Sequence, residues 1–185
     1  MILAPAGPGD VELLLRFRTE AAQWLADRGI DQWQDPWPSP QGLLDDIARS
    51  VAAGETWILW HAGQAAATIT VDRTPNPGLW TPSELAEPAL YAHKLTVTRA
   101  HAGQNLGAEL LDWAGNLAAH TDARWLRLDA WTTNQNLQRY YERLGFQHVR
   151  TVNLPHNPSG ALYQRPAAEA PTPRIRAERG RDPSR

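Results

Sequence analysis

Apolar residues recur every three or four positions in four segments of the chain, which is the period of a helix with one buried face. The segments that we predict to be helical are 10–29, 39–54, 105–119 and 134–144. Each begins at a residue suited to an N-cap (aspartate, serine or asparagine), and glycine ends or follows three of them. The capping residues therefore agree with the hydrophobic pattern about where the helices begin and end.

Short runs of alternating or continuous apolar residues predict the strands. They are residues 1–4, 56–60, 65–71, 89–98, 125–131, 146–152 and 161–164. His61-Ala62-Gly63 joins the second and third strands as a hairpin, whereas the proline-rich stretch 72–88 is predicted to be an irregular loop. The order of elements is β-α-α-β-β-β-α-β-α-β-β, which indicates one mixed α/β (α+β) domain.

Length and composition agree with a single ordinary domain. The chain has 185 residues, of which 42% are hydrophobic and 21% charged. Residues 166–185 differ, because they are rich in Pro, Ala and Arg and hold almost no large apolar side chain. We therefore predict a folded domain over residues 1–165 and a disordered tail over residues 166–185.

Composition also disfavours several kinds of site and partner. There is no cysteine, and the six histidines form no pair at a spacing of three or four residues, so we expect neither a disulfide nor a histidine-built metal site. The net charge is −2, to which residues 166–185 contribute +2 (five Arg against three acids), so the body carries −4. A mildly acidic body favours cationic amines over nucleic acid. Without a secretory signal or an apolar run of about 20 residues, we expect a cytoplasmic protein that binds no membrane.

The strongest local motif is a strand that runs into a glycine-containing turn and then a helix. Over residues 95–108 the sequence is Leu-Thr-Val-Thr-Arg-Ala-His-Ala-Gly-Gln-Asn-Leu-Gly-Ala. Small residues let backbone N–H groups approach an anion closely, and the helix N-terminus adds about half a positive charge. The motif is neither a P-loop nor a dinucleotide-binding fingerprint, because the residues that define those motifs are missing. Taken alone, it fits an anion site and a plain tight turn equally well.

A second motif consists of Asn134, Tyr141 seven residues later, and the pair Gly145-Phe146. Together the two motifs resemble the acetyl-CoA-binding motifs of the GNAT superfamily of N-acetyltransferases, an Arg/Gln-x-x-Gly-x-Gly/Ala turn followed by Asn, Tyr and Gly-Phe. The resemblance covers roughly residues 1–165. It implies the GNAT acyl-CoA N-acyltransferase fold, a central mixed, mostly antiparallel, twisted sheet flanked by about four helices.

The resemblance also implies the reaction. We expect an N-acetyltransferase that moves the acetyl group of acetyl-CoA to the primary amine of a small molecule by direct attack in a ternary complex, without a metal. The residues expected to contact acetyl-CoA are Leu95, Val97, Ala102, Gly103, Gln104, Asn105, Leu106, Gly107, Ala108, Asn134 and Tyr141. Ala102 stands where Arg or Gln is usual and Asn105 replaces a glycine, but Ala102 keeps its N–H and asparagine tolerates a left-handed backbone. Asn134 is expected to bond the pantetheine arm, to cap its helix, or both.

Three catalytic tasks follow from the resemblance. Backbone N–H groups of the strand at Leu95 to Val97 are expected to stabilise the charge that develops on the carbonyl oxygen. Tyr141 matches the acid that protonates the departing thiolate, with a core tyrosine and the neighbouring Tyr140 as alternatives. His93 titrates near neutrality and is the candidate general base, direct or through water, with a purely structural histidine as the alternative.

The acceptor pocket is expected beside the loop 29–34, between the first two predicted helices, where this family borders its acceptor. The predicted substrate-binding residues are Asp31, Trp33, Gln34 and Trp80. An indole can shape a pocket by stacking and cation–π contact, but a loop tryptophan also covers sheet edges. Trp33 is left open between the two roles, whereas the covering role is favoured for Trp37 and Trp80.

Other functions fit parts of the same pattern. A non-catalytic acyl-CoA-binding regulatory module would bind the co-substrate without turnover of any amine. A plain interaction domain, whose glycine turn binds nothing, would show no affinity for CoA. An enzyme that acetylates protein N-termini or lysines would need a wide open groove, whereas a closed pocket lined by tryptophan favours a small molecule. Members of the family often form dimers, so a homodimer is an alternative to a monomer.

Overall fold

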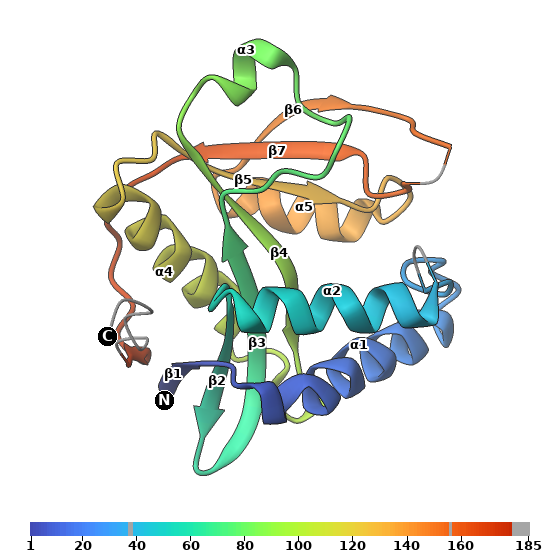
Figure 1. Cartoon of the computed structure of the whole chain (residues 1–185), viewed down its shortest axis with the longest axis vertical. Helices are drawn as coiled ribbons and strands as arrows, with labels where there is room; N and C mark the ends of the chain where they lie inside the picture. Colours follow the sequence, from blue (N-terminus) through green and yellow to red (C-terminus); the bar gives the residue numbers. More distant parts are fainter. Residues whose placement is uncertain (37–38, 156, 179–185) are drawn as a thin grey trace.

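The computed structural model describes residues 1–36, 39–155 and 157–178, which form one sheet with helices on both of its faces (Figure 1). In this part of the chain the strand order is β6-β7-β5-β4-β3-β2-β1-β8. The strands are β1 (Ile2–Pro5), β2 (Thr56–His61), β3 (Gln64–Asp72), β4 (Ala89–Val97), β5 (Trp125–Ala130), β6 (Gln147–Thr151), β7 (Ala161–Pro166) and β8 (Arg176–Ala177). Neighbouring strands are antiparallel except for the pairs β4–β5 and β1–β8, which confirms the mixed, mostly antiparallel sheet.

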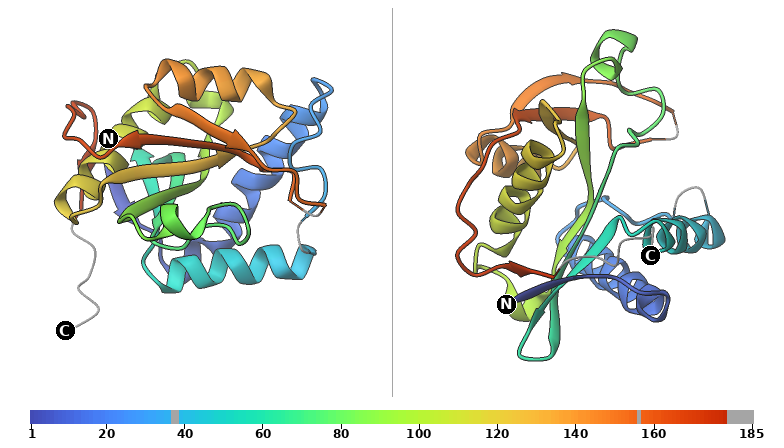
Figure 2. Two further views of the ribbon diagram at one scale, coloured as in Figure 1. Left: turned by 90° about the horizontal axis from the view of Figure 1, so that it is seen from above. Right: turned by 60° about the vertical axis from the view of Figure 1, so that its left-hand side comes forward.

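The helices follow the hydrophobic pattern of the sequence. They are α1 (Val11–Ala26), α2 (Pro40–Ala52), α3 (Pro82–Leu85), α4 (Leu106–His120) and α5 (Gln135–Arg143). Figure 2 shows α1 and α2 on one face of the sheet and α4 and α5 on the other. Ser39 Oγ accepts a hydrogen bond from Gly42 N at 3.0 Å and so starts α2 where the sequence predicted. No helix of the described residues is long and apolar enough to cross a membrane.

The single turn α3 lies in the stretch 72–88, which was predicted to be a loop. Its start has the pattern of a capping box, because Thr81 Oγ1 accepts from Glu84 N while the Glu84 carboxylate accepts from Thr81 N at 2.8 Å. Four residues are too few to show a hydrophobic period, so this helix had no signal of the kind that predicted the others.

Strand side chains alternate between two cores, one on each face of the sheet. Leu59 belongs to the larger core, which lies beneath α4, whereas its neighbour Ile58 packs with Ile47 and Val51 of α2. On β5 the buried residues Leu126, Leu128 and Ala130 all face the larger core. Arg127 and Asp129 alternate with them and therefore point to the opposite face.

The sheet opens between β4 and β5. These two strands pair in parallel only over Ala89–Tyr91 and Trp125–Arg127. Beyond that point β4 stays with β3, but its register shifts so that one residue of β3 opposes Lys94 and Leu95. Lys94 has a left-handed φ of 52°. Such a β-bulge bends its strand and leaves the extra residue outside the ladder, and here it adjoins the opening between β4 and β5.

Residues 167–178, which were expected to be disordered, lie against the body of the protein. Asn116 of α4 exchanges hydrogen bonds with the backbone of Ala170 at 2.6 and 2.9 Å, and Arg174 pairs with Glu109. The segment ends as β8 beside β1. Polar contacts, backbone pairing and the packing of Ala167 and Ile175 against the larger core hold it. Because it has no core of its own, its composition alone suggested disorder. The remainder of the predicted tail, residues 179–185, lies outside the described residues.

Candidate functional site

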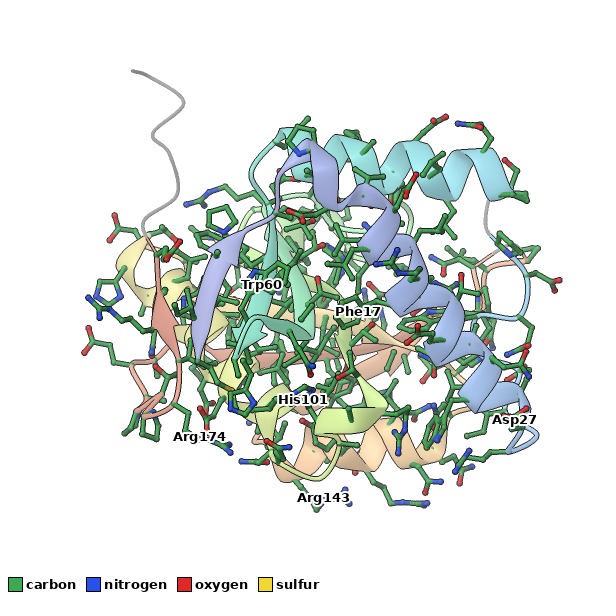
Figure 3. The ribbon with its side chains drawn as sticks, turned by 90° about the horizontal axis from the view of Figure 1, so that it is seen from below. Phe17, Asp27, Trp60, His101, Arg143 and Arg174 are labelled. Carbon is green, nitrogen blue, oxygen red and sulfur yellow. The ribbon has the colours of Figure 1, made fainter. Side chains whose placement is uncertain are left out.

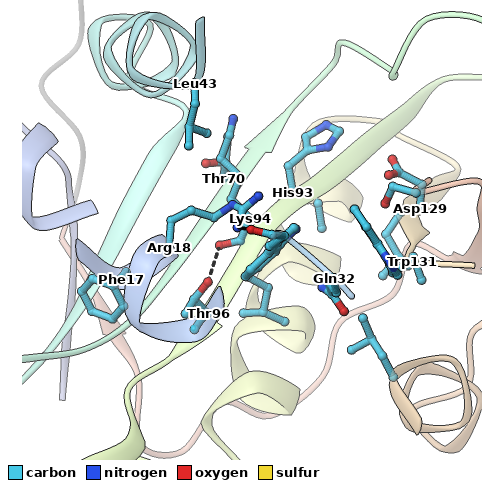
Figure 4. Close-up of a pocket in the computed structure, with 18 of the residues that line it drawn as sticks. Phe17, Arg18, Gln32, Leu43, Thr70, His93, Lys94, Thr96, Asp129 and Trp131 are labelled. Atoms are coloured by element: carbon cyan, nitrogen blue, oxygen red, sulfur yellow. Dashed lines mark hydrogen bonds between the residues drawn. The ribbon is translucent and has the colours of Figure 1, made fainter. Parts of the chain in front are cut away.

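A cleft of about 1610 Å³ passes through the opening between β4 and β5. On one face of the sheet it is bordered by α1, α2 and the loop 30–35, and on the other by the first turns of α5. Between them the end of β3, the bulged half of β4 and the end of β5 line it. Figure 4 shows the side chains that converge on it from these elements. The cleft thus joins the two faces of the sheet.

Half of the sixteen predicted site residues line this cleft. They are Asp31, Trp33, Gln34, His93, Leu95, Val97, Asn134 and Tyr141. The turn 102–108 does not line it but lies at the start of α4. Trp80 is a correction: it is 7% exposed and packs edge-on against Tyr91, away from the cleft, because a loop position in sequence does not imply an exposed side chain. Trp37 lies outside the described residues.

The turn before α4 presents a row of unused backbone donors. Gly103 and Asn105 both have left-handed φ angles, 79° and 61°, as the substitution of glycine by asparagine predicted. Among the described residues no hydrogen bond uses the N–H groups of 103–105, and those of 106–108 precede the first bond of α4, from Glu109 N to Asn105 O. Leu106 and Ala108 bury their side chains, so the turn offers its backbone. These donors at a helix N-terminus suit a phosphate group.

A chain of hydrogen bonds holds this turn to the β2–β3 hairpin. Thr98 Oγ1 donates to Ala66 O at 3.1 Å, so it must accept from His101 Nδ1, which lies 2.9 Å away. His101 Nε2 is then the acceptor for His61 Nδ1 at 3.3 Å. His101 is labelled in Figure 3, which views the molecule from below. Both histidines are therefore engaged in positioning the turn.

Tyr141 has a free hydroxyl beside the cleft. Its ring is 8% exposed and packs against Phe146 and Tyr163, but no hydrogen bond among the described residues uses its hydroxyl. Burial, and then the neighbouring Tyr140 and Asp129, raise the pKa of Tyr141 well above its usual value of about 10. The phenol is therefore protonated at neutral pH and has a proton to donate.

Tyr140, the alternative acid, points elsewhere. A Cβ atom added at Gly107 would lie 2.7 Å from the Tyr140 hydroxyl, which shows that this group rests on the first turn of α4. Tyr140 is also absent from the lining of the cleft. Of the two tyrosines, only Tyr141 reaches the opening between β4 and β5.

His93 lies on the face of the sheet that α1 and α2 cover, between two carboxylates. Strand pairing sets Thr70 opposite His93 and Asp72 opposite Tyr91, so all four share one face. His93 Nε2 is 3.4 Å from Asp72 Oδ1. Burial lowers the pKa of His93, but the nearby carboxylate of Asp72 and then that of Asp129 outweigh it, so the pKa is raised above its usual 6.5. A proton taken up by this imidazole is thus stabilised.

Asp129 was missed by the sequence analysis, as was Asp72. Asp129 follows Arg127 by two positions on the same face of β5. The Oδ1 atom of Asp129 accepts a hydrogen bond from Asn76 Nδ2 at 2.7 Å. Burial raises the pKa of Asp129, and no Lys or Arg of the described residues pairs with it. The signal that could have found it is geometric: Tyr91 pairs with Arg127, so two residues further on His93 and Asp129 face the same side.

The loop 30–35 is tied to the segment after β5. Asn134 Oδ1 accepts from Leu137 N at 3.0 Å, which confirms its helix-cap role, and Asn134 Nδ2 donates to Gln32 Oε1 at 2.7 Å. Gln32 is buried, whereas the predicted Gln34 is exposed and donates to Ala22 O. Gln32 was not predicted, because nothing in the sequence distinguishes its orientation from that of Gln34.

Asp31 braces the same loop from its other side. Its Oδ1 accepts from Thr133 Oγ1 at 2.6 Å and from Trp131 Nε1 at 3.0 Å. The hydrogen bond from Thr133 lowers the pKa of Asp31 and outweighs desolvation, which would raise it. With this oxygen engaged, Asp31 fixes the position of Trp131 at the edge of the cleft.

Comparison with known proteins agrees with this geometry. The model of the acetyltransferase (GNAT) family matches residues 18–146, more than half of the chain. The N-acetyltransferase YesJ of Bacillus subtilis (strain 168), itself described as uncharacterized, is 30% identical over 154 residues, which are 78% of this chain and 81% of YesJ.

Solved structures give the same result. A GNAT acetyltransferase from Listeria monocytogenes 4b F2365 is 26% identical, with a TM-score of 0.73 over 89% of this chain and 93% of its own. The structure of yncA from Salmonella typhimurium with its cofactor acetyl-CoA is 15% identical, with a TM-score of 0.62 over 92% and 96% of the two chains, and shows the shared fold. The chain therefore belongs to the GNAT family of acetyltransferases.

Proposed function

We propose that the protein transfers the acetyl group of acetyl-CoA to the primary amine of a small molecule, by direct attack within a ternary complex. The cleft through the opening of the sheet is the observation that carries the proposal. Its volume of about 1610 Å³ exceeds the ~300–1,000 Å³ of a pocket for one small ligand, so two ligands can meet in it. The indoles of Trp33 and Trp131 line it, which favours a small acceptor over a protein chain.

Acetyl-CoA fits the other half of the site. The backbone donors of 103–108 suit its pyrophosphate, and the apolar side chains of Leu95, Val97 and Leu137 line the way from β4 to α5 for its pantetheine arm. YesJ is named an N-acetyltransferase and yncA was solved with acetyl-CoA, and both agree with this co-substrate.

Each wall of the cleft then has one task. The bulge at Lys94–Leu95 directs backbone N–H groups to the carbonyl oxygen of the thioester, where negative charge develops. The amine nitrogen bonds to the carbonyl carbon while the carbon–sulfur bond breaks. Tyr141 gives its proton to the departing sulfur, and His93 takes the proton that the nitrogen loses, directly or through water. The products are an amide and the free thiol of CoA.

Binding of acetyl-CoA is expected to raise the thermal unfolding midpoint. At about 100 times the dissociation constant, a ligand that binds only the folded state stabilises it by about 2.7 kcal/mol. For a domain of this size each kcal/mol corresponds to about 2–4 °C, so we expect a shift of about 5–11 °C. Thermal unfolding with and without acetyl-CoA measures it.

Two further measurements complete this test. S-acetylpantetheine, which lacks the pyrophosphate, should shift the midpoint much less if the turn 103–108 binds phosphate. A panel of primary amines, followed by the release of the CoA thiol, then tests transfer. Binding of acetyl-CoA without turnover of any amine would favour the regulatory module, and no shift at all would favour an interaction domain.

The pH dependence of turnover should report His93. A base must be unprotonated, so kcat/KM should rise with pH through the pKa of His93, which lies above 6.5 because Asp72 and Asp129 outweigh the effect of burial. Asp72→Asn removes the nearest carboxylate and lowers the pKa of His93. The rise of kcat/KM on the acid side of the pH profile should therefore move to lower pH. Asp45→Asn is the control: Asp45 is an exposed carboxylate of the cleft that accepts a hydrogen bond from Gln41, and its replacement should leave the rise of kcat/KM at the wild-type pH. If the rise stays at the wild-type pH in Asp72→Asn as well, His93 is excluded as the base.

A further inference from the structure

Arg18 is a cleft cation that forms no ion pair with any acid of residues 1–36, 39–155 and 157–178. It reaches from α1 into the pocket toward β4, as Figure 4 shows. No ion pair of the described residues includes Arg18, and its hydrogen bond goes to the backbone oxygen of Trp33 at 3.1 Å. Burial lowers the pKa of Arg18 to about 10. A half-buried charge that has no counter-charge is unfavourable, and a bound anion would relieve it.

The other cations of the cleft differ from Arg18. Lys94 and Arg49 both pair with Asp46 of α2. Arg28 and Arg99 are exposed to water and stack on the ring of Trp24, at 4.0 and 4.1 Å. Arg18 alone among these five side chains is both half-buried and free of a carboxylate. Its charge is therefore not balanced by a carboxylate within the part of the chain that the structure describes.

Trp33 holds Arg18 in place before any ligand arrives. The Arg18 guanidinium lies 4.2 Å from the centre of the Trp33 ring, in addition to the bond to its carbonyl. Trp33 has a left-handed φ of 71°, which is uncommon for a bulky residue and is found where the surroundings impose it, often at functional sites. Because a guanidinium carries five N–H donors, donors remain for a second partner.

The opposite wall carries groups that can hold an amine. Asp129 lies across the pocket from Arg18 in Figure 4, with His93 between them. No Lys or Arg of the described residues pairs with Asp129, and its Oδ1 accepts from Asn76 Nδ2. One wall thus offers the guanidinium of Arg18, and the other offers the carboxyl group of Asp129 beside the His93 imidazole. A ligand that bears an anionic group at one end and an amine at the other would find a partner on each wall.

We propose that the acceptor is an amino-carboxylate, whose carboxylate is bound by Arg18 while its amine is held near His93 and Asp129. This inference rests on the proposed acetyl transfer and specifies its substrate class. Arg18 is then a specificity-determining residue, since it touches the acceptor without taking part in the exchange of protons. The alternative role of Arg18, a brace for the Trp33 loop, makes a different prediction for the experiment below.

The experiment compares amines that differ only in charge. Each protein L-α-amino acid, β-alanine and 4-aminobutyrate is tested beside its carboxamide, with release of the CoA thiol as the readout. We expect at least one carboxylate to be preferred over its carboxamide by about 30-fold or more in kcat/KM, the effect of losing one partner of a buried charge pair. In Arg18→Gln, which can still donate to the Trp33 carbonyl, this ratio should fall toward one through a higher KM. Arg18→Lys should restore part of it.

Arg28→Gln serves as the matched control, because Arg28 is an exposed cation of the same cleft, and it should keep the wild-type ratio. A ratio near one in the wild type, or an equal loss for both members of a pair in Arg18→Gln, would overturn the anion site and leave acetyl transfer standing. If acetyl-CoA binds but no amine of either kind is acetylated, the proposed transfer fails instead. In that case thermal shifts of the acetyl-CoA complex with the same carboxylates decide: a shift lost in Arg18→Gln supports the anion site, and no shift overturns it.

Discussion

Replacement of Tyr141 by phenylalanine is expected to lower kcat by about 10²–10⁴, the usual contribution of a positioned general acid. The change removes one hydroxyl and keeps the ring that packs on Phe146 and Tyr163, so the fold should persist. Since that hydroxyl has no hydrogen bond within the described residues, its loss leaves no protein group unpaired. Steady-state release of the CoA thiol measures kcat, and the thermal shift with acetyl-CoA should stay close to that of the wild type.

Tyr140→Phe is the matched control for this prediction. It removes the same atom from the neighbouring residue, whose hydroxyl rests on Gly107 rather than in the cleft. We expect kcat to change by less than about 10-fold, because no proton transfer depends on this group. A larger loss in Tyr140→Phe than in Tyr141→Phe would reverse the assignment. Equal activity of Tyr141→Phe and the wild type would mean that water protonates the thiolate.

The fold could be predicted where one element buries one face. The period of apolar residues located α1, α2, α4 and α5 to within a few residues, because each buries a stripe against the sheet. It did not find β8, a strand of two residues whose pairing with β1 depends on how the segment after β7 crosses α4. Contacts of that kind arise only in the folded chain, so local composition wrongly suggested disorder for residues 167–178.

The candidate site was predictable to the extent that motifs mark it. Asn105 and Asn134 adopt the left-handed and helix-cap conformations that their motifs imply. The residues between the motifs have no such mark, because Asp72, Asp129 and Arg18 come from three separate elements. They meet through the strand register and the placement of α1 over the opening of the sheet. The motifs therefore predicted the residues that we propose to bind acetyl-CoA, whereas the residues proposed for the acceptor could be found only from the structure.

Arg127 is the largest fully buried polar side chain on the wall behind this site. It is 0% exposed, and its guanidinium donates to the Glu84 carbonyl at 2.6 Å, to Glu87 Oε2 at 2.9 Å and to Gln164 Oε1 at 3.2 Å. These bonds tie the end of the stretch 72–88 to β5 and β7. Because Arg127 pairs with Tyr91 where β4 and β5 are still joined, it lies just before the point at which the sheet opens.

Arg127→Met is expected to lower the free energy of unfolding by about 2–5 kcal/mol, because each buried acceptor left without its donor costs about 1–3 kcal/mol. Methionine keeps most of the volume, so the loss would come mainly from the Glu84 carbonyl and the Gln164 amide oxygen, which lose their donor, whereas Glu87 keeps its bonds from Arg124 and Trp125. Urea unfolding measures this loss as a lower midpoint of the transition with an unchanged slope.

Arg124→Met is the matched control, because Arg124 pairs with the same Glu87 at 2.8 Å but its side chain is 65% exposed. A surface ion pair contributes only about 0–1 kcal/mol. Similar losses in the two variants would show that burial of Arg127 adds nothing to its pairing. A larger loss in Arg127→Met, together with weaker acetyl transfer, would connect this buried network to the geometry of the opening that it borders.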